Sequence, residues 1–173
     1  LGYLKGVQEA DESGVCIVEV AGTEGFVNAS TTQVVDGMEI QAKSPAVLEE
    51  RTRVVREYLG IHNQDCKNCL RTDNCELQNI VRDLYIVTDP ATNKRSGCPI
   101  DDSSYVVRDN NKCIKCGRCV TMCKEIQAVH AIDQFGGVGL GSCVRSNGAF
   151  TLADTNCVNC GQCIIACPVG ALR

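Results

Sequence analysis

The feature that most constrains this chain is a run of closely spaced cysteines that occurs twice in its C-terminal part. The runs are Cys113-x2-Cys116-Gly117-x-Cys119-x3-Cys123 and, 44 residues later, Cys157-x2-Cys160-Gly161-x-Cys163-x3-Cys167-Pro168. Gaps of two and three residues suit thiolates that converge on one metal centre, whereas disulfides need particular Cα separations and directions. We therefore interpret these cysteines as metal ligands and the repeat as a duplicated cluster-binding unit.

The spacing within each run is typical of a bacterial [4Fe-4S] motif, in which three cysteines of one loop bind a cluster and the fourth binds the other cluster. Backbone N–H groups in such a loop point at the sulfur atoms and stabilise their charge. This pattern assigns Cys113, Cys116, Cys119 and Cys167 to one cluster, and Cys157, Cys160, Cys163 and Cys123 to the other. A zinc ribbon would leave the third cysteine of each run without a role.

A third group of ligand residues, His62-x3-Cys66-x2-Cys69-x5-Cys75, precedes the repeat. Three cysteines and one histidine form a common structural zinc set, so the spacing alone leaves zinc and an iron-sulfur cluster both open. Because a histidine ligand is neutral, a cluster here would carry one less negative charge and should be easier to reduce.

Composition indicates small subdomains tied by metal rather than one large core. The 173 residues include 14 cysteines and no tryptophan, and only 4% are aromatic. No apolar run reaches the roughly 18 residues of a membrane span, and 17 basic residues are interleaved with 21 acidic ones, so we expect neither a membrane span nor nucleic-acid binding. Reduced metal-ligand thiols predict a cytoplasmic protein.

The N-terminal part is expected to be β-rich. Residues 14–42 contain β-branched runs separated by turn signals, among them Asp36-Gly37. Val15, Ile17, Val20 and Phe26 are expected to form its apolar core.

Helices are expected in the middle of the chain. Ser44 is a suitable N-cap for an amphipathic helix over 45–59, which Gly60 should end. Arginines and glutamates alternate on this helix, which favours a solvated face with local ion pairs. A second helix is expected over 75–84, and residues 88–97 are rich in turn-forming residues and predict a linker.

Several features carry no predicted chemistry. The glycine-rich stretch 136–141 fits no nucleotide-binding pattern and predicts a turn, and no phosphate-binding loop or nucleophile motif is present. His130 has no ligand spacing around it and is expected to be structural. Cys16, Cys98 and Cys143 are expected to be buried free thiols, with Cys98 the one most suited to contact an extra cluster or a partner. We expect electron transfer, without a catalytic site in this chain.

The whole chain resembles the N-terminal electron-relay region of iron-only hydrogenases, the large iron-sulfur subunit of respiratory complex I and the small diaphorase subunit of NAD-reducing hydrogenases. The segments that carry the resemblance are residues 1–6, 18–20, 36–38, 75–78, 102–104 and 113–119. It implies an α+β chain of three domains: a plant ferredoxin-like β-grasp over 1–43, a small helical [4Fe-4S] domain with one histidine and three cysteines over 44–97, and a bacterial two-cluster ferredoxin domain over 98–173.

The chain departs from this family at the first domain. Where the family has the four cysteines of a [2Fe-2S] cluster, this sequence has Gly2, Ser13, Cys16 and Ser30. One thiolate cannot hold such a cluster. We therefore expect a degenerate β-grasp without [2Fe-2S], three [4Fe-4S] clusters in all, and an N-terminal loop more mobile than one pinned by metal.

The resemblance also implies a function. It predicts an iron-sulfur subunit of a hetero-oligomeric complex, relaying electrons between a flavin-containing, NAD(P)H-oxidising partner and ferredoxin or a hydrogenase-type centre, with electron bifurcation as one form of this activity. The sequence starts at Leu1, not Met, and ends at Arg173 where an iron-only hydrogenase would continue, so we expect either a truncated chain or a short subunit. The rival hypothesis is a structural or redox-sensing module with zinc at His62. A free-standing ferredoxin would not need the residues before Cys113.

Overall fold

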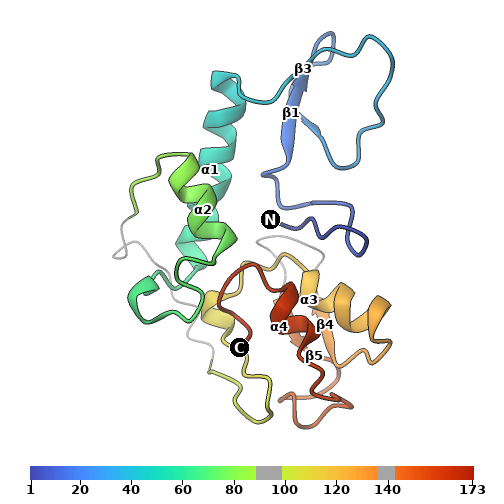
Figure 1. Ribbon diagram of the computed structural model, residues 1–173, viewed down its shortest axis with the longest axis vertical. Coiled ribbons are helices and arrows are strands. Elements are labelled where there is room, and N and C mark those ends of the chain that lie inside the picture. The colour runs from blue at the N-terminus through green and yellow to red at the C-terminus, as the bar shows by residue number, and fades with distance from the viewer. Residues whose placement is uncertain (89–98, 136–142) are drawn as a thin grey trace.

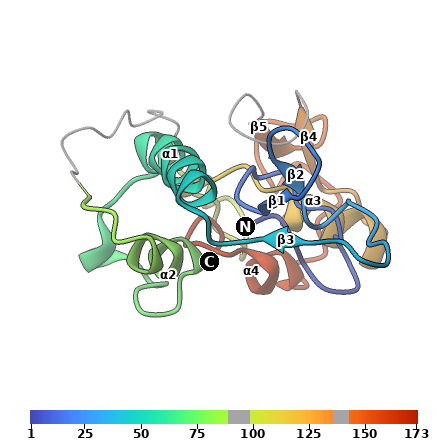
Figure 2. The same cartoon turned by 90° about the horizontal axis from the view of Figure 1, so that it is seen from above.

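The computed structural model describes residues 1–88, 99–135 and 143–173, which form a mixed fold of short helices and two small sheets. In Figure 1 the first sheet lies at the top, a long helix descends from it, and the cysteine-rich C-terminal part lies at the bottom, with the N-terminus between them. Seen from above, α1 and α2 form one side of the molecule (Figure 2). The helices described are too short or too polar to cross a membrane.

The first sheet is three-stranded and antiparallel, in the order β2-β1-β3. β1 (Ile17–Val20) pairs with β2 (Val27–Asn28) on one side and β3 (Ile40–Gln41) on the other. Val18 and Val20 are buried, whereas the residues between and before them are not, as the two-residue period of a strand requires. The turn at Gly37 uses a positive φ of 77°.

Of the four residues expected to form the core of this unit, only Val20 is buried, while Val15 and Ile17 are half-buried. Phe26 is 41% exposed and does not join the buried residues. It directly precedes the two-residue strand β2, which is too short to cover a large ring. The sheet is instead attached to the helix that follows, where Arg51 donates to the carbonyl oxygen of Ile17 at 2.6 Å.

That helix, α1 (Pro45–Ile61), begins as predicted, because the Ser44 side chain accepts a hydrogen bond from the backbone of Val47 at 3.2 Å. Its end is not the one predicted. α1 continues through Gly60 and ends at Ile61, and the extended backbone of the next residue, His62, still donates to the carbonyl oxygen of Tyr58 at 3.0 Å. A glycine costs only about 1 kcal/mol inside a helix, which the burial of one face of α1 outweighs. Arg53 pairs with Glu50 and Glu57 on the outer face.

The region after α1 contains a 3₁₀ turn, η1 (Cys66–Asn68), and the second expected helix, α2 (Glu76–Asp83). Cys75 is the N-cap residue of α2, and Leu77 is its buried anchor. The predicted linker 88–97 lies outside the described residues apart from Thr88.

The C-terminal part consists of two similar halves around a small hairpin. Its elements are η3 (Asn110–Lys112), α3 (Arg118–Thr121), the π-helical turn η4 (Met122–Ile126), β4 (Ile132–Phe135), β5 (Cys143–Ser146) and α4 (Gln162–Ala166). β4 and β5 pair antiparallel. The predicted glycine-rich turn at 136–141 falls between them, outside the described residues. Ile114, Leu152 and Val169 are almost fully buried and form the centre of this part.

Candidate metal centres

The two cysteine runs have the same backbone shape. Lys115 and Gly117 in the first run take positive φ angles of 58° and 81°, and Asn159 and Gly161 in the second take 55° and 74°. Such turns direct consecutive N–H groups into a concavity that binds anions, including cluster sulfurs. The backbone N–H of Lys115 lies 3.3 Å from the Sγ of Cys113. The glycines then serve as left-handed N-caps of α3 and α4.

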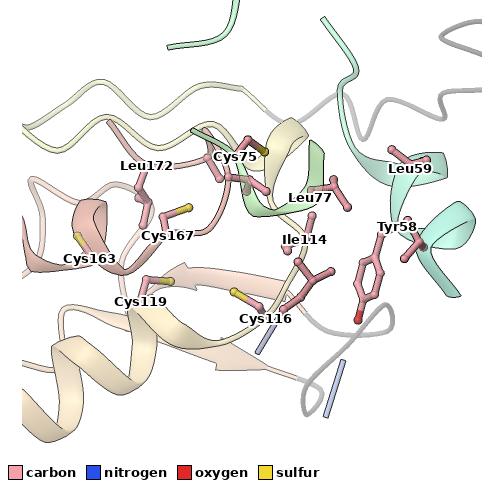
Figure 3. Packing of buried hydrophobic residues seen from close by; sticks show 14 of the residues in the cluster. Tyr58, Leu59, Cys75, Leu77, Ile114, Cys116, Cys119, Cys163, Cys167 and Leu172 are labelled. Atoms are coloured by element: carbon pink, nitrogen blue, oxygen red, sulfur yellow. The ribbon is translucent and has the colours of Figure 1, made fainter. Parts of the chain in front are cut away.

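Four cysteines line one small pocket in the C-terminal part. They are Cys113, Cys116, Cys119 and Cys167, the first C-terminal set. Three come from the first run, and Cys167 arrives from the end of α4, next to the second run. Figure 3 shows the sulfur atoms of Cys116, Cys119 and Cys167 facing one space, with the sulfur of Cys163 pointing away from it.

The charge state of this set depends on its burial. Burial, together with the neighbouring Cys167 and Cys113, raises the pKa of Cys116 to about 12, although the backbone N–H of Arg118 acts in the opposite direction. The pKa of Cys119 is raised well above its usual value for the same reasons. Several thiolates in one apolar cavity therefore need a compensating cation. The donor chemistry fits a metal cluster, because thiolates are the ligands that such clusters bind.

The second C-terminal set consists of Cys123, Cys157, Cys160 and Cys163. Burial raises the pKa of Cys163 to about 12, and the negative charges of the other three members add to this rise, so all four lie within electrostatic range. The backbone N–H of Ala131 donates to the Sγ of Cys123 at 3.3 Å. Cys160 is exposed, so this set reaches the surface. Cys163 also raises the pKa of Cys119, which places the two C-terminal sets next to each other.

The middle set, His62, Cys66, Cys69 and Cys75, lines a second cavity. The His62 ring is buried, and its Nδ1 lies 2.8 Å from the carbonyl oxygen of Lys112. A carbonyl can only accept, so Nδ1 carries the hydrogen and Nε2 the lone pair. Burial lowers the pKa of His62, which keeps the ring neutral at pH 7. A neutral imidazole oriented by a carbonyl is the form that binds metals.

Cys75 in this set lies at the start of α2. Burial raises the pKa of its thiol, while the backbone N–H groups of Leu77 and Gln78 act to lower it. These are unpaired donors of the first helical turn, so the helix start stabilises a thiolate there.

Across the described residues, no three His, Cys, Asp or Glu side chains converge closely enough to bind a single metal ion.

The middle set is attached to the first C-terminal set by contacts that sequence analysis did not anticipate. Arg71 donates through Nη2 to the carbonyl oxygens of Ile164 at 2.9 Å and Cys167 at 2.7 Å. Gly170 lines the middle cavity, and a Cβ there would lie only 2.6 Å from the Sγ of Cys69. Neither residue belongs to a ligand pattern, because both act through contacts between segments about 100 positions apart.

Glu76 adds to the same contact region. Its backbone N–H donates to the carbonyl oxygen of Pro168 at 3.0 Å, and its carboxylate receives two hydrogen bonds from Arg118, at 2.6 and 2.7 Å. The start of α2 therefore lies directly against the residues that follow Cys167.

The remaining candidates lie outside the three ligand sets. Gly2, Ser13 and Ser30 all hydrogen-bond to Asp11. Cys16 is expected from the sequence to be a buried thiol, but it is only half-buried, because it directly precedes β1 and lies outside the core cluster. His130 is exposed and has a left-handed backbone, with φ 55°. Cys98 lies outside the described residues, as does the side chain of Cys143.

Two family matches cover much of the chain. Residues 51–88 match the NADH-ubiquinone oxidoreductase-G iron-sulfur binding region, and residues 112–171 match the 4Fe-4S dicluster domain. The middle set lies within the first range, and both C-terminal sets lie within the second.

Individual relatives agree. The chain is 38% identical over 161 residues to the NADP-reducing hydrogenase subunit HndD of Solidesulfovibrio fructosivorans, covering 91% of this chain and 27% of the relative. It is 36% identical over 125 residues to iron hydrogenase 1 of Clostridium pasteurianum, covering 68% and 21%. It is 32% identical over 174 residues to an NADH-quinone oxidoreductase subunit of Rhizobium meliloti, covering 98% and 20%. The chain thus spans about a fifth to a quarter of these relatives.

A solved structure shares the fold. An NAD⁺-reducing [NiFe]-hydrogenase in the H2-reduced state superposes with a TM-score of 0.88 at 23% identity, covering all of this chain and 73% of that one.

Proposed function

This chain belongs to the iron-sulfur family that includes the electron-relay region of iron-only hydrogenases and the large iron-sulfur subunit of complex I, and on that premise we propose that it is an electron-transfer subunit of an NAD(P)H-linked complex. Its electrons would pass between a flavin-containing, NAD(P)H-oxidising partner and a second redox centre, either ferredoxin or a hydrogenase-type site. Electron bifurcation and a cytoplasmic location are part of this proposal.

Three ligand sets form the proposed relay, each holding one [4Fe-4S] cluster. The first and second C-terminal sets exchange their fourth cysteine, Cys167 for Cys123, and the middle set uses His62 through Nε2. The mutual electrostatic influence of the cysteines within each set supports this crossed assignment. A bound [4Fe-4S] cluster supplies reversible one-electron chemistry.

The observation that carries the proposal is the continuous packing of the three sets. Gly170 brings the segment after Cys167 against Cys69, which joins the middle set to the first C-terminal set. Cys119 and Cys163 then join the first C-terminal set to the second. In the proposed relay the three sets form a row, with the largely buried middle set at one end and the exposed Cys160 at the other.

The first domain, residues 1–43, is proposed to hold no [2Fe-2S] cluster. Among the four positions that the resemblance assigns to ligands, only Cys16 has a thiol. The other three, Gly2, Ser13 and Ser30, are hydrogen-bonded to Asp11. We keep the division into 1–43, 44–97 and 98–173, which the start of α1 at Pro45 supports.

Metal and spectroscopic analysis of the anaerobically purified chain tests the assignment. We expect about 12 irons, four for each of three clusters, visible absorbance that bleaches on reduction, and no [2Fe-2S] signal in electron paramagnetic resonance. One zinc per chain with about eight irons would support the rival zinc-containing module instead. Co-purification from native cells tests the partner, since an NAD(P)H-oxidising flavoprotein should accompany the chain and reduce it.

A further inference from the structure

The N-terminal loop is organised by one buried carboxylate. Asp11 is 2% exposed, and its Oδ1 accepts hydrogen bonds from the backbone N–H groups of Gly2 at 2.9 Å and Ser13 at 2.8 Å. The backbone N–H of Asp11 in turn donates to the Oγ of Ser30 at 2.8 Å, and its carbonyl oxygen accepts from the Asn28 side chain at 2.7 Å. A single residue thus connects the start of the chain, the segment before β1 and the segment after β2.

Three of these contacts fall at the positions to which the family resemblance assigns cluster ligands: Gly2, Ser13 and Ser30. A Cβ at Gly2 would lie 2.6 Å from Oδ1 of Asp11, which is closer than real Cβ atoms approach another heavy atom. A side chain at residue 2 and the Asp11 carboxylate therefore exclude each other in this arrangement. Hydrogen bonds to a buried charge, which are stronger than neutral ones, close this loop in the absence of a metal.

The closed loop is in contact with the first C-terminal set. The Gln8 side chain donates from Nε2 to the carbonyl oxygens of Gly2 at 2.8 Å and Cys116 at 3.0 Å. Its Oε1 accepts from the Thr121 hydroxyl in α3 at 2.6 Å. All of the hydrogen-bonding groups of this one amide thus face either the loop or the first cysteine run, which are about 110 residues apart in sequence.

We propose that residues 1–43 have exchanged electron transfer for a positioning role, in which Asp11 closes the loop in place of a metal and Gln8 holds the Cys116 peptide. Gln8 is then a positioning residue for the first C-terminal set. This inference rests on the proposed function, because it takes residues 1–43 as free of metal and Cys116 as a cluster ligand. A [2Fe-2S] signal from the unmodified chain would contradict the proposed function, whereas the variants below test the positioning role separately.

Restoring the lost ligands tests the role of Asp11. The substitutions Gly2→Cys, Ser13→Cys and Ser30→Cys, together with the native Cys16, are compared with and without Asp11→Ala after reconstitution with iron and sulfide. We expect a [2Fe-2S] signal, and about two additional irons, only when Asp11 is replaced. Additional iron in both chains, or in neither, would overturn the idea that the carboxylate stands in place of the cluster.

Single substitutions test the connection through Gln8. We expect Gln8→Ala to change the paramagnetic line shape of one cluster, the one whose signal disappears in Cys116→Ala, and to speed its loss to an iron chelator several-fold. Asp11→Ala should have the same effect, whereas Asp11→Asn should not, because an amide oxygen can still accept from Gly2 and Ser13.

The matched control is Glu12→Ala, which removes an exposed carboxylate next to Asp11. It should leave all line shapes and chelation rates unchanged. If Gln8→Ala matches this control in both measurements, the positioning role is refuted, whatever happens to the stability of Asp11→Ala.

Discussion

Gly170→Ala provides a sharp test of the contact between the C-terminal segment and the middle set. The added Cβ would lie 2.6 Å from the Sγ of Cys69, and ordinary contact begins at about 3.4 Å, so the sulfur or the loop must move by about 0.8 Å. Metal-site distances tolerate about ±0.2 Å. Gly170 does not have a positive φ, so alanine brings no backbone strain, and the whole effect comes from this contact.

The expected result is a selective defect in the middle set. Iron content should fall from about 12 to about 8 per chain, while the signals of the two C-terminal sets persist. In the metal-free chain the Cys69 side chain can rotate away. The free energy of unfolding should therefore fall by no more than the roughly 1–3 kcal/mol that overpacking a core costs. Iron analysis and paramagnetic resonance of the loaded chain, with urea unfolding of the metal-free chain, measure both effects.

Gly60→Ala is the matched control. Gly60 also has no positive φ, but a Cβ there meets nothing within 4 Å. Within α1 this substitution should retain all irons and stabilise the chain by about 0.5–1 kcal/mol. A Gly170→Ala chain with full iron content and an unchanged middle signal would refute the proposed packing of Cys69 against the C-terminal segment.

Three further predictions concern other parts of the chain. Cys123→Ala should remove the same cluster as Cys160→Ala, because both belong to the second C-terminal set; loss of the other cluster's paramagnetic signal would show that the fourth ligands are not exchanged. His62→Cys should keep a cluster in the middle set and lower its reduction potential, since a charged thiolate stabilises the oxidised state, and a redox titration measures this. Tyr58→Phe removes the hydrogen bond from the buried hydroxyl to the carbonyl oxygen of Ser13, 3.0 Å long, and should cost about 1 kcal/mol in urea unfolding without changing iron content.

Local patterns in the sequence were sufficient where the physics is local. The start of α1 follows from the hydrogen bond between the Ser44 side chain and a backbone three residues later, and the second helix follows from the spacing of its apolar residues. The glycine shared by both cysteine runs is visible in the sequence, whereas its left-handed conformation at Gly117 and Gly161 is seen only in the structure. Candidate metal ligands can also be recognised in the sequence, because Cys and His side chains can bind metal in any fold.

The errors arise where tertiary packing decides. Gly60 has the local preference of a helix end, but the buried residues on either side of it, such as Leu59, extend α1 to Ile61. Phe26 has the apolar character of a core residue, yet the short strand beside it leaves the ring exposed. In both cases a preference of about 1 kcal/mol competes with the packing of whole elements, and no local pattern shows how those elements meet.

The amino-acid sequence alone therefore determined which side chains can bind metal and that the cysteine run is duplicated, and through the family resemblance it predicts that the first site lacks three of its thiols. Only the tertiary structure decided how these parts adjoin. Asp11 closes the loop at Gly2, Gln8 reaches Cys116, and Gly170 lies against Cys69 across separations of 9 to about 110 residues. Side-chain chemistry belongs to each residue separately, whereas such contacts exist only once the chain has brought distant backbone segments together.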